Sequence, residues 1–275
     1  MPEMTGSAAE SAVTRQAEAA KPEKMGATEH LEVISAPGIE ELGQTPEVSK
    51  SALLTEKVQF SVWNEEKTAL LTETEDGSAA LYALPGENLD GGVLLRGDDT
   101  LVKFPWRYAT NYRAELKLWL RDMDGDRTKE LVVSCQIGGG TGVNYEEFHV
   151  VKKTENGNLS AYAVPQELWT SLASALKLVE NDGRLYAVLG QELVDLSFIT
   201  EKLEEDNVPE RLGCGDWVRF AASAWSDTDI EVEAGVWMAG ELLPVLACYV
   251  GNVRGHITFR DGEFSLDDLH LDVWE

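Results

Sequence analysis

Hydrophobic and polar residues alternate along most of this chain with a period of two, as they do in a β-strand that has one face in a core and the other in water. Residues 113–121, RAELKLWLR, show this most clearly, because the leucines share one face and most of the charged residues share the other. Residues 131–137, LVVSCQI, are instead apolar almost throughout. We therefore expect a central strand there, covered on both faces.

Turn-forming residues separate these strand-like segments at short intervals. Residues 177–199 predict a three-stranded meander with turns at residues 181–183 and at Gly190, and a further hairpin turn is expected at residues 261–262. The pattern as a whole predicts a mainly β fold. We expect antiparallel meanders and hairpins, arranged like a propeller or a sandwich, with one or two short helices.

The best helix candidate is residues 165–178, where Pro165 suits the first turn of a helix. Apolar residues recur there at helical spacing and would form one stripe facing a core. The stripe consists of Leu168, Leu172, Ala175 and Leu176.

Residues 1–52 differ in composition from the rest of the chain. They contain no Phe, Tyr or Trp and are rich in Glu, Ala, Ser, Thr and Pro, so they offer too little apolar surface to offset the entropy of ordering. We expect a disordered acidic tether over residues 1–52. Residues 53–275 are expected to form a β-rich globular region, which can be subdivided near residues 165–200.

The chain carries 49 acidic and 23 basic residues, a formal net charge of −26. Such an excess repels nucleic-acid phosphates and anionic membranes, and it suits surroundings that contain salt or millimolar calcium. No run of about 18 apolar residues occurs, so no transmembrane segment is expected, and the chain shows no export signal. Three cysteines, an odd number, do not suggest a disulfide framework.

Residues 121–133, RDMDGDRTKELVV, place carboxylates at alternate positions of a turn between two strand-like segments. Carboxylates that converge repel one another unless a cation lies among them, and calcium takes about six to eight oxygen ligands. We therefore expect a calcium site in this loop. Its ligands would be the carboxylates of Asp122, Asp124, Asp126 and Glu130 and the backbone carbonyl of Thr128.

The loop is not an EF-hand, because its twelfth position is Val133, where that motif requires a bidentate glutamate. The alternative interpretation is a solvated acidic turn that binds no ion. In that case Arg127 would neutralise one of the aspartates.

The loop resembles the calcium loop of FG-GAP and VCBS-type repeats. The resemblance lies in the acidic positions and the apolar strand after them: Asp122, Asp124-Gly125, Asp126 and Glu130. Those loops commonly have glycine where this chain has Arg127, which must adopt an unfavourable backbone conformation and brings a positive charge near the ion. The resemblance therefore implies a weak calcium site.

Residues 89–196 also resemble an uncharacterised family of secreted or lipid-anchored proteins of anaerobic gut bacteria. The shared order is the acidic loop, then the glycine-rich stretch IGGGTGVN, then the strand-like NYEEFHVV. The resemblance implies an exported protein with no assigned reaction and brings no catalytic residues.

Other chemically suggestive patterns favour structural interpretations. Residues 138–144 are rich in glycine but lack the Gly-Lys-Ser/Thr of a phosphate loop, so we expect a wide turn or bulge there. Ser174 and Lys177 have the spacing of S-x-x-K without its partner motifs, which indicates an ordinary helix surface. The histidines show none of the spacings of a zinc site.

Four of the eight tryptophans lie at strand ends or on the polar side of strands, from which an aromatic face can hold a sugar or a peptide. They are Trp106, Trp119, Trp217 and Trp225. The alternative is that they are core residues of a large β-rich fold.

These observations predict an exported or cell-surface binding module without catalytic residues. Its calcium-binding loop would be structural, and its partner would be a protein, a peptide or a glycan. Two other classes stay open: a hydrolase whose site is assembled only in the fold, and the sensing ectodomain of a membrane signalling protein.

Overall fold

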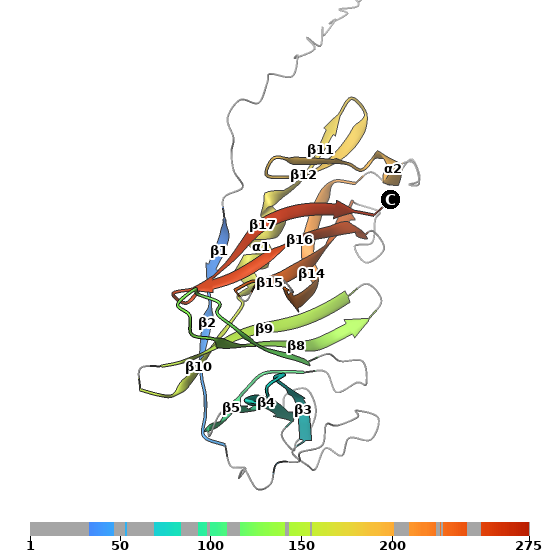
Figure 1. Cartoon of the computed structure of the whole chain (residues 1–275). Helices are drawn as coiled ribbons and strands as arrows, with labels where there is room; N and C mark the ends of the chain where they lie inside the picture. Colours follow the sequence, from blue (N-terminus) through green and yellow to red (C-terminus); the bar gives the residue numbers. More distant parts are fainter. Residues whose placement is uncertain are drawn as a thin grey trace, which may run out of the picture.

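The computed structural model describes residues 33–46, 53, 69–83, 93–97, 100–108, 116–140, 143–154, 156–200, 209–223, 226, 228–240 and 249–274. Within these residues the chain is mainly β, as predicted (Figure 1). No helix in the described part is long and apolar enough to cross a membrane.

The largest sheet has ten strands and consists of two halves. The C-terminal half-sheet contains β1 (Ile34–Pro37), β17 (Glu263–Val273), β16 (Tyr249–Arg260), β15 (Ile230–Ala239) and β14 (Arg211–Ala222). The middle half-sheet contains β7 (Leu116–Arg121), β8 (Glu130–Gly140), β9 (Val143–Lys153), β10 (Leu159–Ala163) and β2 (Ile39–Leu42). Trp217 of β14 and Asn144 of β9 pair where the two halves meet.

Two smaller sheets complete the fold. One contains β3 (Ala69–Glu73), β4 (Ala79–Ala83), β5 (Val93–Gly97) and β6 (Thr100–Phe104). The other is the predicted meander of β11 (Leu176–Asn181), β12 (Arg184–Leu189) and β13 (Glu192–Asp195). Its turns lie where expected, with positive φ angles of 51°, 74° and 58° at Asp182, Gly183 and Gly190.

The middle half-sheet lies between two hydrophobic cores, because alternate residues of its strands point to opposite faces. Val132 of β8 and Phe148 of β9 belong to the first core, which the C-terminal half-sheet also lines. Val133 and Cys135 of β8 belong to the second core, which they share with β3–β6. The prediction that LVVSCQI is a central strand is therefore confirmed, and the sheets are stacked as layers (Figure 1).

Helix α1 (Gln166–Ala175) packs on the first core through Leu168, Trp169 and Leu172. The predicted helix over residues 165–178 is correct in position but too long at its C-terminal end. Leu176 has an extended backbone and pairs with Leu189 of β12, so the chain changes to strand while the apolar stripe still points into the core. The second helix, α2 (Ser197–Thr200), is a single turn.

The predicted tether over residues 1–52 is wrong for the segment that forms β1 and β2. Ile34 and Ala36 are buried in the first core, and β1 pairs antiparallel with β17. Strand β2 pairs with β10, so backbone hydrogen bonds to two strands distant in the sequence order a segment of low hydrophobicity. Residues 1–32 and 47–52 lie outside the described residues.

Side chains join the two half-sheets where backbone pairing stops. Asn144 Nδ2 donates to the carbonyl of Val218 at 2.8 Å, and the buried Glu146 accepts the N–H of Phe220 at 3.3 Å. Lys117 Nζ donates to the carbonyl of Phe220 at 2.9 Å and lies 3.3 Å from Glu146 Oε2. These contacts hold β7 beside the diverging end of β14.

Candidate metal centre

The acidic loop is the connection between β7 and β8. Pairing of Arg121 with Glu130 brings the two ends of the loop together, although they are nine positions apart in the sequence. Met123, the second loop residue, is buried in the first core and ties the loop to the body of the protein. Gly125 and Arg127 have φ angles of 78° and 73°, so the unfavourable backbone predicted for Arg127 is confirmed.

Three carboxylates gather at the base of this loop, with one oxygen of each lying within 4.8 Å of the others: those of Asp122, Asp124 and Glu130. Each carboxylate also accepts a backbone N–H from the loop. Arg127 donates to Asp122 Oδ2 at 3.0 Å, Asp126 to Asp124 Oδ1 at 3.0 Å, and Met123 to Glu130 Oε2 at 2.8 Å. The backbone thus orients each group and leaves its second oxygen for another partner.

A lysine from the neighbouring strand supplies a positive charge to the cluster. Lys152 of β9 donates a hydrogen bond to Asp124 Oδ2, and its Nζ lies 3.7 Å from Glu130 Oε1. The alternative interpretation assigned the neutralising charge to Arg127, but the cation seen on the cluster is Lys152. Arg127 reaches Asp122 through its backbone N–H.

Burial and charge act on the three ionisable groups in different directions. Burial raises the pKa of Glu130, and the nearby charge of Asp124 raises it further, although the Met123 N–H opposes both. Burial also acts to raise the pKa of Asp124, but the hydrogen bond and charge of Lys152 outweigh it, so that pKa is lowered. Lys152 has a raised pKa because its carboxylate partners outweigh the effect of its burial.

One buried oxygen of the cluster is left unsatisfied. Asp122 Oδ1 is inaccessible to solvent and accepts no hydrogen bond from the residues that the structure describes. A buried carboxylate oxygen without a partner is costly, so this atom favours an additional cation or donor. Because three carboxylates place oxygen atoms close together, the cluster could hold a metal ion.

The other two predicted ligands lie outside this group. Asp126 is exposed, and its Oδ1 accepts the N–H of Thr128 at 2.6 Å. Thr128 is exposed as well, and the contribution of its backbone carbonyl stays a prediction. Asp124 and Gly125 also line a cavity of about 380 Å³, together with Thr258, Arg260 and Asp267, so solvent reaches the cluster from one side.

Sequence reasoning missed Lys152 because its position depends on strand pairing. The register of β8 on β9 pairs Leu131 with Val151, which sets Lys152 beside Glu130. The only trace in the sequence is a polar residue at the end of an alternating strand, which is common on any exposed face.

Two of the other candidates, Trp106 and Ser174, have structural roles. Trp106 is only 1% exposed, stacks between Phe104 and His149 and donates to Glu41 Oε2 at 2.8 Å, so it is a core residue. Ser174 donates to the Thr170 carbonyl on the exposed side of α1, as expected for a helix surface.

The remaining elements of the sequence interpretation have mixed outcomes. A bulge lies between Gln136 and Gly138, at the start of the glycine-rich segment for which a wide turn or bulge is predicted, while residues 141–142 and Trp225 lie outside the described residues. Of the described His, Cys, Asp and Glu side chains, only Asp122, Asp124 and Glu130 form a group that could bind a metal.

Comparison with protein-family models, curated proteins and solved structures finds no match to this chain. Fold and site together therefore define only a class: a mainly β protein of stacked sheets with an acidic cluster that could hold a metal ion.

Proposed function

We propose that this chain is an exported or cell-surface binding module, without catalytic activity, whose β7–β8 loop binds Ca²⁺ through Asp122, Asp124 and Glu130. The observation that supports the metal is the convergence of three carboxylates, each oriented by a backbone N–H and one with a buried, unpartnered oxygen. The bound ion would hold the loop and the start of β8 in place.

The ligand set favours calcium over other biological metals. All three side chains offer oxygen, which disfavours zinc and the softer transition metals. Magnesium requires near-ideal octahedral geometry and gives up its water reluctantly, whereas calcium accepts the irregular geometry of a loop. Backbone carbonyls and water would complete its shell.

Lys152 and Arg127 make the site weak, since a calcium ion must compete with the ammonium group already on Asp124. Extracellular calcium modules have dissociation constants of about 0.1 to 1 mM and are filled only where calcium is near millimolar. A weak site is therefore useful outside a cell and empty inside one, which agrees with export and with the net charge of −26.

Thermal melts of the full chain test the metal. With a dissociation constant of about 0.2 mM, roughly 2 mM calcium stabilises the chain by about 1.4 kcal/mol relative to chelator, a rise in Tm of about 3 to 6 °C. Asp122→Asn removes this rise.

The matched control is Asp76→Asn. Asp76 lies in the turn between β3 and β4 and accepts hydrogen bonds from Thr74 and Ser78, but it is in no acidic group that could hold a metal, so the calcium response is retained. A wild-type Tm that is identical in calcium and in chelator contradicts the proposed metal site. Fractionation of the source cells, with the chain found only in cytosol, contradicts export.

A further inference from the structure

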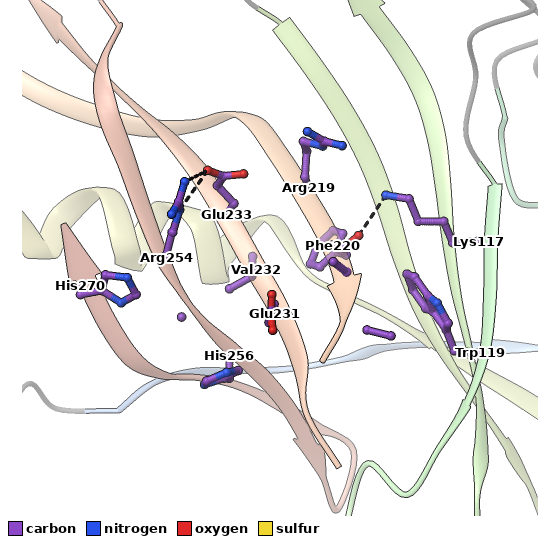
Figure 2. A pocket seen from close by; sticks show the side chains of 13 residues that line it. Lys117, Trp119, Arg219, Phe220, Glu231, Val232, Glu233, Arg254, His256 and His270 are labelled. Atoms are coloured by element: carbon purple, nitrogen blue, oxygen red, sulfur yellow. Dashed lines mark hydrogen bonds and ion pairs between the residues drawn. The ribbon is translucent and has the colours of Figure 1, made fainter. Parts of the chain in front are cut away.

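A groove of about 700 Å³ lies between β7 and the sheet of β14–β17, and none of the ligands of the proposed calcium site lines it. Figure 2 shows that its floor is the exposed face of β14–β17 and that Lys117 and Trp119 of β7 form one wall. Its size is in the range of sites that bind small molecules or short oligomers, about 300 to 1,000 Å³.

Strand register arranges the polar floor in two rows. In the first row, Arg219, Glu233, Arg254 and His270 are successive neighbours across β14, β15, β16 and β17. In the second row, Ala221, Glu231 and His256 are neighbours across β14, β15 and β16. Four adjacent strands span roughly 14 Å, which suits an extended ligand lying across the strands.

Most of the charges in the groove are already paired. Arg254 lies 3.0 Å from Glu233 and 3.1 Å from Asp272, and Lys117 is held by Glu146 and the carbonyl of Phe220. By contrast, the side chains of Arg219 and Glu231 form no hydrogen bond or ion pair with any residue that the structure describes, although the Arg219 guanidinium lies 5.9 Å from the Trp217 ring. Among the Arg, Lys, Asp and Glu side chains of the groove, one guanidinium and one carboxylate of opposite charge therefore remain without an ion-pair partner.

This balance decides the charge of the ligand. An anionic ligand would gain Arg219 but would meet Glu231 and the overall charge of −26. A cationic ligand would gain Glu231 and the attraction of the overall charge, but it would meet Arg219 inside the groove. An uncharged ligand rich in hydroxyl groups can accept hydrogen bonds from Arg219 and donate them to Glu231 at the same time.

The apolar part of the groove favours the same ligand. Trp119 is partly buried against the first core, which fixes the ring, and its side chain lines the groove (Figure 2). Ala221, Ala222 and Gly255, which have a methyl group or no side chain, also line the groove. A rigid indole beside small residues accommodates a flat ring with apolar C–H faces and polar edges, as a sugar has.

We propose that this groove binds a neutral glycan chain, with Trp119 stacked on a sugar ring and Arg219 and Glu231 bound to its hydroxyl groups. This rests on the proposed binding function and names the class of its ligand. The groove binds the glycan without cleaving it. Hydrolysis of a glycosidic bond commonly uses two carboxyl groups, and Glu233 is occupied by Asn252 Nδ2 at 2.6 Å and by Arg254, which leaves Glu231 as the free one.

The test is calorimetric titration of the full chain, in calcium, with neutral hexasaccharides from glucan, xylan, mannan and galactan backbones. Hexagalacturonate serves as the acidic probe and a chitosan hexamer as the cationic one. We expect at least one neutral hexasaccharide to bind, and we expect Trp119→Ala and Arg219→Met each to weaken its binding by about tenfold or more.

Arg211→Met is the matched control for Arg219→Met. Both arginines are exposed on β14 and lie over a tryptophan ring, at 5.5 Å from Trp237 for Arg211 and 5.9 Å from Trp217 for Arg219, but Arg211 lies outside the groove. Arg219→Met keeps the test valid if Trp119→Ala fails to fold, because Arg219 is exposed.

Four outcomes overturn the inference: no neutral hexasaccharide binds; only the acidic or the cationic probe binds; Arg219→Met binds as well as Arg211→Met; or the bound hexasaccharide is recovered as shorter products. A Tm measured on the same samples with and without calcium separates this inference from the metal. If calcium raises the Tm but no neutral hexasaccharide binds, only the glycan-binding groove is refuted. If a neutral hexasaccharide binds but calcium leaves the Tm unchanged, only the calcium site is refuted.

Discussion

Replacing Lys152 with methionine tests whether calcium and the lysine ammonium group compete for the acidic cluster. Methionine keeps most of the length of the side chain but removes the ammonium group that lies on Asp124 and 3.7 Å from Glu130. The variant is expected to be less stable than wild type without calcium and to bind calcium more tightly. A single change should therefore shift stability and affinity in opposite directions.

The size of the effect follows from distance and burial. Two unit charges at 3.7 Å interact by about 4 kcal/mol at an effective dielectric constant of about 20. Removing one partner of a buried pair costs about 3 to 5 kcal/mol, and an exposed pair contributes about 0 to 1 kcal/mol. The Glu130 side chain is 3% exposed and that of Lys152 is 30% exposed, so we take an intermediate value of about 2 kcal/mol.

The expected result in chelator is a fall in Tm of about 4 to 8 °C relative to wild type. The calcium ion no longer has to displace the ammonium group, whose interaction with the carboxylates contributes about 2 kcal/mol, so the dissociation constant for calcium falls roughly 30-fold. Melts across about 0 to 10 mM calcium measure the first effect, and calorimetric titration measures the second.

The control is Lys153→Met, which removes the same charge one position along β9, where the side chain is exposed and Lys152 still occupies the cluster. It should leave both the chelator Tm and the calcium affinity close to wild type. If Lys152→Met binds calcium no better than Lys153→Met, Lys152 does not compete with the ion, and the assignment of these carboxylates as ligands is refuted.

Three further predictions concern the loop and the core. Arg127→Gly relieves the strain of a φ of 73°, so it should stabilise the chain by about 1 kcal/mol in chelator, as measured by thermal melts. The change also removes a positive charge near the proposed ion, so it should tighten calcium binding, as measured by titration. Burial raises the pKa of Glu130, so the folded chain holds the proton of this carboxyl group more tightly than the unfolded chain does. The stability that the protonated group contributes is fully present below its ordinary pKa of 4.5 and is lost as pH rises through the raised value. The stability of Glu130→Gln relative to that of wild type should therefore increase as pH rises from about 4.5 to 7. The variant should also lose the calcium response. Parallel pH–Tm curves for the two proteins would contradict this prediction. Phe148→Ala should lower the free energy of urea unfolding by about 3 to 5 kcal/mol, because Phe148 is buried in the first core. Tyr145→Ala is the control on the same strand: its side chain is 45% exposed, so it should lower that free energy by about 0.5 kcal/mol or less.

Local patterns predicted much of the secondary structure. The alternation in β7, the continuous apolar run of β8 and the turns of the β11–β13 meander were all recognisable, because strand period and turn chemistry are properties of neighbouring residues. The helix was found by its apolar stripe, and only its C-terminal end was misplaced. That end depends on the pairing of Leu176 with Leu189, which no local pattern contains.

Segments whose order depends on distant partners were missed. Residues 34–42 lack the hydrophobicity of a core strand, so composition alone predicts that they belong to the tether, yet they pair with β17 and β10. For Trp106, which ends a strand, the sequence leaves a ligand-binding surface position and a core position open, and stacking on His149 from β9 decides for the core. In both cases the free energy of ordering comes from contacts with residues far along the chain.

The sequence by itself determined that this protein is mainly β, that it is strongly acidic and that one turn concentrates carboxylates, because each of these is a property of composition or of short-range spacing. Only the tertiary structure decided which carboxylates meet, that Lys152 lies among them, and that β7 stands beside the open face of β14–β17 to form the groove. The physical reason is that strand register and sheet stacking are set by the burial of two shared cores, and a core is the property of the whole chain.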